Sequence, residues 1–190
     1  MPDASRVVAR GRLLVASPRL QDPNFDRSVV LVLEHDQDGT LGLVLNRPTI
    51  TPVAEILAPW AECADQAPPA VVFGGGPVSP DVAVGLAGLS TASDDPGSLP
   101  VVGRIGLVDL STAPSTQALP VMPVRVFAGY AGWGPGQLGA EMAEGAWFVV
   151  DAQAQDLVAK EPADLWRSVL RRQGDGLRML AAFPADVTLN

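Results

Sequence analysis

One short segment of the chain carries the side chains of general acid–base catalysis. His35 follows Glu34 and precedes Asp36, so an imidazole stands between two carboxylates. A neighbouring carboxylate can orient a histidine and stabilise its charged form, as a general base requires. Adjacent strand residues point to opposite faces, however, and no Gly-x-Ser-x-Gly turn supplies a serine nucleophile. We therefore expect a structural or solvent-facing His35, with a catalytic or ligand-binding histidine as the alternative.

A glycine-rich segment late in the chain could bind an anion. Residues 129–139 place glycines between an expected strand and an expected helix, where free N–H groups and the helix dipole favour negative charge. Residues 134–139 also match the Gly-x-Gly-x-x-Gly pattern of dinucleotide sites. Pro135 removes one N–H there, and the strand–helix–strand context of that pattern is missing. A structural turn under Tyr130 and Trp133 is the first expectation, and an anion pocket is the alternative.

Two other segments carry weaker chemical signals. Residues 74–77 are glycine-rich but lack the Lys-Ser/Thr of a phosphate loop, which favours a strained turn. Cys63 is the single cysteine and has acidic neighbours, which disfavour the reactive thiolate. With one cysteine and one histidine, a single chain can form neither an internal disulfide nor a metal site with several such ligands. We expect no metal and no cofactor.

The composition is that of a globular protein with an acidic balance. Of the 190 residues, 47% are hydrophobic, which excludes a wholly disordered chain. The net charge of −8 repels nucleic acid, so direct nucleic-acid binding is not expected, although residues 1–19 carry a local excess of arginine. No apolar run is long enough to span a membrane, and a lone thiol suits the reducing cytoplasm. We expect one cytoplasmic domain over residues 1–190, with residues 1–9 flexible.

Hydrophobic patterning predicts the elements that position these residues. Strands are expected at residues 13–17, 28–34, 41–46, 71–73, 82–87, 101–110, 124–129 and 146–151, and the strand at 101–110 is interrupted by Gly103 and Gly106. The run at 28–34 is almost continuously apolar, which predicts a strand buried on both faces and paired in a hairpin with 41–46. Helices are expected at residues 51–58, with Thr51 as N-cap, at 136–144, with Glu141 and Glu144 exposed, and at 163–173.

The remaining stretches are rich in residues that favour turns and loops. Loops are expected at residues 59–70, 90–100 and 111–123, with a helix at 113–119 as an alternative, and the tail 184–190 is expected to be extended. The order of elements is not a regular alternation of strand and helix. It predicts an α+β fold with a largely antiparallel or mixed sheet.

Several blocks of residues, in order along the chain, resemble the YqgE/AlgH family. The blocks are Gly11-Arg-Leu-Leu-Val-Ala-Ser-Pro18, Ser28-Val-Val-Leu-x-Leu-Glu-His35, Gly42-Leu-Val-Leu-Asn-Arg-Pro48, Gly75-Gly-Pro-Val78 and Arg125-x-Phe-x-Gly-Tyr-Ala-Gly-Trp133. With Gly136-Gln-Leu138 and the terminal Leu189-Asn190, they span nearly the whole chain. Residues 79–123 match poorly, and Gly139 stands where the family commonly has an acidic residue.

The resemblance implies a particular form of the α+β fold. A strongly bent, largely antiparallel or mixed sheet would form a pseudo-barrel with helices packed outside. It also implies a bacterial, cytoplasmic protein of the kind often labelled a transcriptional regulator. It brings no catalytic residues with it.

Two function hypotheses follow. The first is a non-enzymatic regulatory or protein-binding role with an unidentified protein partner. The alternative is a protein that binds or acts on a small anionic ligand or nucleotide where its glycine-bearing loops meet, with Arg47 or Arg125 pairing the anion as a fork. The candidate ligand-binding residues are Asn46, Arg47, Gly75, Gly76, Arg125, Tyr130, Gly132, Trp133, Gly136 and Gln137. This alternative requires these loops to lie together in the fold.

Overall fold

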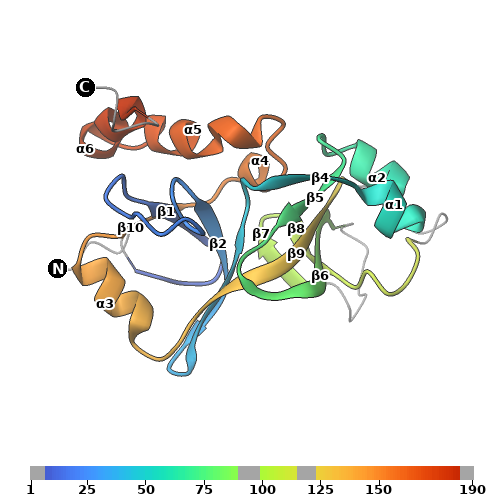
Figure 1. The fold of residues 1–190 in the computed structure, drawn as a ribbon, viewed down its shortest axis with the longest axis horizontal. Coiled ribbons are helices and arrows are strands. Elements are labelled where there is room, and N and C mark those ends of the chain that lie inside the picture. The colour runs from blue at the N-terminus through green and yellow to red at the C-terminus, as the bar shows by residue number, and fades with distance from the viewer. Residues whose placement is uncertain (1–6, 90–98, 115–122, 185–190) are drawn as a thin grey trace.

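The computed structural model describes residues 7–89, 99–114 and 123–184, in which ten strands form one curled sheet (Figure 1). The main path of the sheet runs β10-β1-β2-β3-β9-β6-β8-β7, and β4 and β5 attach beside β9. The β5–β9 pair is parallel and the other described pairs are antiparallel. The sheet bends into a half-barrel with helices outside it. The predicted α+β class with a strongly bent, largely antiparallel sheet is confirmed.

The strands and helices have the following bounds. The strands are β1 (Arg12–Ala16), β2 (Val29–Asp36), β3 (Gly39–Val44), β4 (Pro48–Pro52), β5 (Val71–Gly74), β6 (Val78–Gly88), β7 (Leu99–Val102), β8 (Ile105–Val108), β9 (Val124–Trp133) and β10 (Trp147–Asp151). The helices are α1 (Val53–Ile56), η2 (Ala58–Trp60), α2 (Ala61–Asp65), α3 (Gln137–Ala143), α4 (Ala154–Leu157), η3 (Pro162–Asp164), α5 (Leu165–Arg171), α6 (Asp175–Arg178) and η4 (Met179–Ala182).

Strands β1 and β2 are buried on both faces, as the continuous apolar run predicted. Leu13 and Leu31 point into a core that α5 closes, whereas Leu14 and Val30 point into a second core that contains Trp147. Strand side chains alternate between faces, so a strand between two cores must be apolar at every position. Burial ends after Leu33, and the tip of the β2–β3 hairpin is exposed. The hairpin itself is confirmed.

Helix α5 covers the first core with the stripe of residues predicted from its spacing. Leu165, Trp166, Val169 and Leu170 are all buried against β1 and β2. In Figure 1, α5 and α6 lie along one side of β1 and β2, and α3 lies on the other. Each face of these two strands therefore has its own helical cover.

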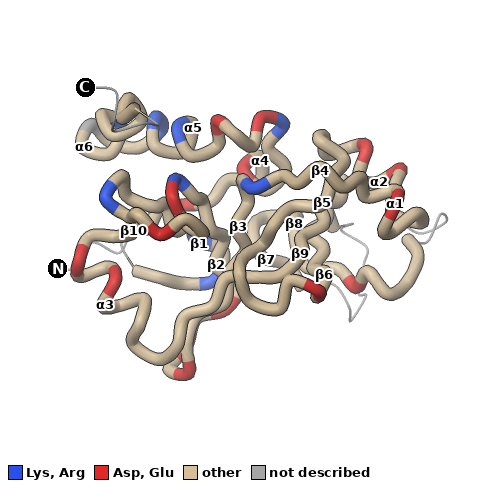
Figure 2. Tube along the Cα trace, viewed as in Figure 1, with Lys and Arg blue, Asp and Glu red and all other residues tan. Residues whose placement is uncertain are grey.

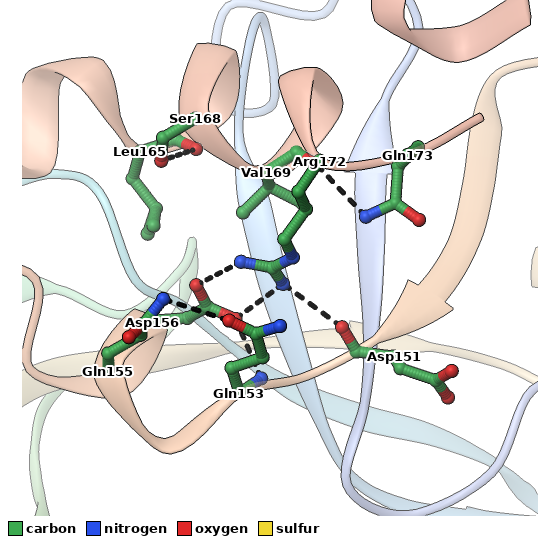
Figure 3. A network of polar contacts seen from close by, with 9 residues as sticks. All are labelled: Asp151, Gln153, Gln155, Asp156, Leu165, Ser168, Val169, Arg172 and Gln173. Carbon is green, nitrogen blue, oxygen red and sulfur yellow. Dashed lines mark hydrogen bonds and ion pairs between the residues drawn. The ribbon is translucent and has the colours of Figure 1, made fainter. Parts of the chain in front are cut away.

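A buried ion pair fastens α5 to the segment after β10 (Figure 3). Arg172, just past α5, donates from Nη1 and Nη2 to the two carboxylate oxygens of Asp156, at 2.5 and 2.6 Å. Nη2 also donates to the carbonyl of Asp151, the last residue of β10, at 3.0 Å. The main-chain N–H of Gln153 donates to Asp156 at 2.8 Å, which completes the N-cap of α4. Asp156 is only 3% exposed and has both oxygens occupied, so the pair holds three segments together.

Several sequence expectations are wrong in detail. Residues 59–70 are not all loop, because η2 and α2 fold there, with Trp60 and Ala64 buried against Val72. The expected helix at 51–58 is α-helical only over α1, and η2 begins at Ala58. The N-cap of α1 is Pro52, without a side-chain hydrogen bond, rather than Thr51.

The expected single strand at 101–110 is instead the hairpin of β7 and β8. Gly103, with a φ of +55°, begins the two-residue turn between them, a conformation that glycine adopts without steric cost. Glu141, expected to be exposed, is half-buried and hydrogen-bonded.

Four other expectations fall largely outside the described residues. These are the flexible residues 1–9, the loop at 90–100, the helix at 113–119 and the extended tail at 184–190. Of these, residues 99 and 100 begin β7, and Ala113 and Pro114 are not helical.

The Asp156–Arg172 pair gives a stability prediction with a matched control. Asp156→Ala leaves a largely buried guanidinium unpaired, so we expect it to lower the free energy of unfolding by about 3 kcal/mol and the Tm by about 6–12 °C. Asp164→Ala removes, directly before α5, an exposed partner of Arg171 and should cost about 1 kcal/mol or less. Thermal unfolding followed by circular dichroism measures both. Equal losses in the two variants would contradict a structural role specific to Asp156.

Candidate functional site

The predicted glycines bring two backbones into contact. The N–H of Gly75 donates to the carbonyl of Ala128 on β9 at 2.8 Å, and its carbonyl accepts from Val44 at 2.8 Å. A Cβ on Gly75 would lie 2.2 Å from the carbonyl oxygen of Gly129, and a Cβ on Gly76 would lie 2.2 Å from the carbonyl carbon of Tyr130. No side chain fits there, and the N–H of Gly75 is already occupied. These glycines are required by the close approach of the β5–β6 connection to β9.

The second glycine-rich segment forms the end of β9 and the start of α3. Trp133 is buried, and its indole N–H donates to Glu141 Oε2 at 2.9 Å. The indole N–H of Trp147 donates to the same oxygen at 2.7 Å. Gln137 accepts from the N–H of Gly134 and donates to Glu141, at 3.1 and 3.0 Å. Gly136 is the N-cap of α3 with a φ of +74°. Glu141, which sequence reasoning assigned to solvent, is therefore the centre of this polar cluster.

Tyr130, Gly132 and Trp133 line a groove together with acidic residues of the β2–β3 hairpin. The groove has a volume of about 480 Å³, and its carboxylates are those of Glu34, Asp36 and Asp38. This charge disfavours the anionic ligand that the sequence hypothesis assigned to these loops.

His35 lies beside this groove and makes no hydrogen bond to a carboxylate among the described residues. Its Nδ1 lies 2.7 Å from the hydroxyl of the buried Thr40, and the histidine itself is exposed. The groups that could orient it as a base, Glu34 and Asp36, are exposed on the same hairpin.

Arg125 is the most deeply buried charged residue of the predicted set. It is 1% exposed on β9, and its guanidinium lies over the ring of Phe73, 4.4 Å from the centroid. Its Nη2 donates to the carbonyls of Ala67, Pro68 and Ala159, at 3.3, 3.0 and 2.9 Å. Burial lowers the pKa of Arg125 to about 10, so it keeps its charge at neutral pH. It connects three chain segments inside the protein.

Asn46 and Arg47 line a different pocket, of about 530 Å³, which contains two further arginines. We define the arginine pocket by its lining residues, which are Asp26, Arg27, Asn46, Arg47, Pro48, Ala163, Trp166 and Arg167. Its arginines come from the β1–β2 connection, the β3–β4 connection and α5. Figure 2 shows basic residues, with acidic residues among them, along α4 and α5, and acidic residues on α1, α2, α3 and the β2–β3 hairpin.

Asn46 fixes the geometry of this pocket. It is buried, and its side-chain oxygen accepts from the N–H of Val29 at 3.0 Å while its amide nitrogen donates to the carbonyl of Arg27 at 2.9 Å. One side chain thus ties the start of β2 to the end of β3. The backbones of Arg27 and Arg47 are held beside each other as a result.

The three arginines of the pocket hold main-chain carbonyls rather than carboxylates. Arg27 donates to Phe183 and Pro184. Arg47 donates to Asp26 and Arg167 donates to Ala181. The ion pairs between described residues involve other arginines, namely Arg12, Arg171 and Arg172. A carbonyl satisfies a donor but cancels no charge, so the pocket retains a positive charge.

The balance of the pocket lining is three guanidinium groups against the one carboxylate of Asp26. Burial lowers the pKa of Arg47, and the Asp26 carboxylate opposes this shift. Partial burial also strengthens electrostatic interactions, because less water screens them. Within a chain of net charge −8, this pocket is a local reversal of sign that suits an anion.

The comparisons with known proteins agree with the fold. The profile of the family described as AlgH-like matches residues 13–178. The chain belongs to the AlgH-like family. A UPF0301 protein of Streptomyces coelicolor is 53% identical over 184 residues, covering 95% of this chain and 94% of that protein. One from Mycobacterium tuberculosis is 45% identical over 192 residues, covering 100% and 94%.

Two solved structures resemble this AlgH-like chain. A crystal structure of a Corynebacterium diphtheriae protein has a TM-score of 0.85 at 31% identity, covering 94% of each chain. The solution structure of AlgH from Pseudomonas aeruginosa has a TM-score of 0.65 at 27% identity, covering 98% of this chain and 100% of that one. The predicted YqgE/AlgH resemblance is confirmed.

The family has no assigned molecular function. Nothing in these relatives or in the described residues supports the label of transcriptional regulator. In the described part of the chain, no helix is both long and apolar enough to cross a membrane.

Sequence reasoning found Asn46 and Arg47 of the arginine pocket and missed Arg27, Arg167 and Trp166. Arg27 directly precedes a buried strand and Arg167 interrupts the apolar stripe of α5, which are the local signals that each position carries. Neither signal indicates that residues 140 positions apart share one pocket, so the grouping requires the fold.

Arg125 gives a second stability prediction. Arg125→Ala removes the donor that the carbonyls of Ala67, Pro68 and Ala159 share and leaves a cavity over the buried Phe73. We therefore expect a loss of about 3 kcal/mol or more in the free energy of unfolding. The matched control is Arg104→Ala, because Arg104 is exposed and donates to a single carbonyl, that of Leu89. The control should lose about 1 kcal/mol or less. Urea unfolding measures both, and similar small losses would show that Arg125 does not fasten these segments.

Proposed function

We propose that this AlgH-like protein is a non-enzymatic binding protein whose arginine pocket recognises an anionic group of its ligand. The observation that carries the proposal is that Arg27, Arg47 and Arg167 line one pocket while their hydrogen bonds go to carbonyl oxygens. Charge-assisted hydrogen bonds from arginine to phosphate or carboxylate are about twice as strong as neutral ones. An anion therefore gains more from these groups than their present partners do.

The chemistry around the pocket supports binding rather than catalysis. Its lining offers guanidinium groups, which stay protonated and do not act as general bases at neutral pH. Its single carboxylate, Asp26, lies beside Arg47. The described residues contain no group of three or more His, Cys, Asp or Glu side chains that could hold a metal ion. His35 lies near the exposed tip of the β2–β3 hairpin and does not line the pocket.

The proposal keeps part of each sequence hypothesis. It retains the anion and Arg47 from the ligand hypothesis, with Arg27 and Arg167 replacing the glycine-rich loops as donors. It retains the absence of catalysis from the first hypothesis. The protein partner and the cytoplasmic location predicted from the sequence stay predictions.

Thermal unfolding with two polyanions tests the proposal. Pyrophosphate and citrate carry the two anion classes that guanidinium groups recognise, phosphate and carboxylate. At about 100 times its Kd, either would stabilise the folded protein by about 2.7 kcal/mol, which corresponds to several degrees of Tm. We expect at least one of them to produce this shift, and added sodium chloride to reduce it.

Two variants locate the effect. Arg47→Ala should abolish the anion-induced shift, measured against the Tm of that variant without anion. Arg171→Ala removes an exposed arginine of α5 that pairs with Asp164 outside the pocket, and should keep the shift. The proposal is wrong if neither anion changes the Tm of the unmodified protein, or if Arg47→Ala responds as the unmodified protein does.

A further inference from the structure

The end of the described chain lies against the arginine pocket. Residues 181–184, which we call the strap, follow α5 and α6 and present their carbonyls to two of the three pocket arginines. Arg167 donates to Ala181 at 3.3 Å. Arg27 donates to Phe183 from Nη1 and Nη2, at 3.2 and 3.3 Å, and to Pro184 from Nη2. The strap thus engages the same arginines that the anion would need.

Arg27 is held in this contact by more than its hydrogen bonds. Its guanidinium carbon lies over the ring of the buried Trp166, 4.8 Å from the centroid. Its backbone has a φ of +49°, a left-handed conformation that is uncommon for a residue with a side chain. Asn46 also holds the main chain here, because its side chain donates to the carbonyl of Arg27 and accepts from the N–H of Val29. These contacts fix the position of the Arg27 side chain, so a ligand could exchange the acceptors of its two terminal nitrogens without moving the guanidinium group.

Arginine recognises an oxyanion best with two parallel N–H groups directed at two oxygens. In Arg27 both terminal nitrogens are directed at the strap. An anion that takes the same pair of donors must displace the carbonyl of Phe183. Full negative charge on the incoming oxygens favours this exchange over a neutral carbonyl.

The charge of the pocket selects the class of anion. Three guanidinium groups and one carboxylate leave two positive charges to match, so a ligand with two or more negative charges fits better than a monoanion. The volume of about 530 Å³ exceeds what one phosphate fills. A polyphosphate group, of which pyrophosphate is the simplest example, meets both conditions.

We propose that a polyphosphate ligand and the strap compete for Arg27 and Arg167, so that binding releases residues 181–184 from the edge of the pocket. This inference rests on the proposed anion-binding function and adds its regulation. Coupling of this kind is reciprocal, so whatever holds the strap down weakens binding of the anion by the same factor.

Release of the strap changes the surface next to the pocket. Ala181 is 3% exposed and belongs to the core that α5 closes, whereas Phe183 is already 42% exposed. When the strap leaves, apolar surface of α5 and of residues 180 and 181 becomes accessible. Binding of an anion in the pocket would therefore change the conformation of residues 181–184 and the apolar surface exposed beside them.

Hydrogen exchange on the full-length protein tests the release. The N–H of Phe183 donates to the carbonyl of Leu180 at 3.0 Å, so its exchange reports whether this turn is intact. With saturating pyrophosphate we expect amides of residues 180–183 to exchange at least about 5-fold faster, the lower range of typical allosteric coupling. Amides of β1 and β2, which lie between the two cores, are the internal control and should not change.

A variant outside the pocket tests the reciprocal effect. Leu180→Ala removes a partly buried side chain that packs on the first core and should loosen the strap without touching an arginine. We expect its Kd for pyrophosphate, measured by calorimetry, to fall by about 3-fold or more. Ala182→Ser lies on the exposed side of η4 and is the matched control, with an unchanged Kd.

The outcomes separate this inference from the proposed function. If calorimetry detects binding of pyrophosphate but residues 180–183 exchange at the same rate or more slowly, the competition is wrong and the anion site stands. An unchanged or raised Kd in Leu180→Ala leads to the same conclusion. If neither pyrophosphate nor citrate binds, the proposed function itself fails.

Discussion

Burial of β1 and β2 on both faces is the constraint on which the rest of the structure depends. Their side chains between Leu13 and Ala16 and between Val29 and Leu33 are removed from water almost completely. Two cores must therefore be closed independently, one by α5 and one by α3 with Trp133 and Trp147. Polar groups cannot lie along these strands and are confined to their ends. The arginine pocket forms at one such end, where Asn46 satisfies the N–H of Val29 at the start of β2.

The arginines of this protein differ in their hydrogen-bond partners and in their access to solvent. These two properties distinguish arginines that stabilise the fold from arginines that could bind a ligand. Arg172 pairs with a buried carboxylate, which fastens helices and leaves no net charge. Arg125 is 1% exposed and is buried among carbonyls, so its charge lies inside the protein and away from the surface. Arg27, Arg47 and Arg167 also hold carbonyls but line an open pocket. This last combination gathers, in one pocket, charges that an anion can reach.

The parts of the fold that the sequence predicts well are those in which one local pattern determines the outcome. The run at 28–34 and the stripe of α5 are determined by burial alone. Helix α2 is not, because its residues lie in a Pro/Ala-rich stretch, and Trp60 and Ala64 pack against strands distant in the chain. The break at Gly103 was visible, but only strand pairing shows that it turns β7 back onto β8. Tertiary contacts override local preference at both places.

The candidate site shows the same limit more strongly. Glycine-rich segments attract attention because free N–H groups bind anions, but Gly75 lies where two backbones meet and donates to β9. A glycine-rich pattern indicates that the backbone closely approaches another group, but it does not indicate whether that group is a ligand or another strand. Arginines on three separate elements give no pattern at all until the curled sheet and α5 bring them together. The hydrogen-bond partners of the charged groups decide whether a site can bind an anion. Carbonyl oxygens accept hydrogen bonds from the arginines but do not neutralise their charge, so the pocket keeps its affinity for an anion. The same carbonyls are neutral competitors of that anion, because a ligand must displace them to reach the guanidinium groups.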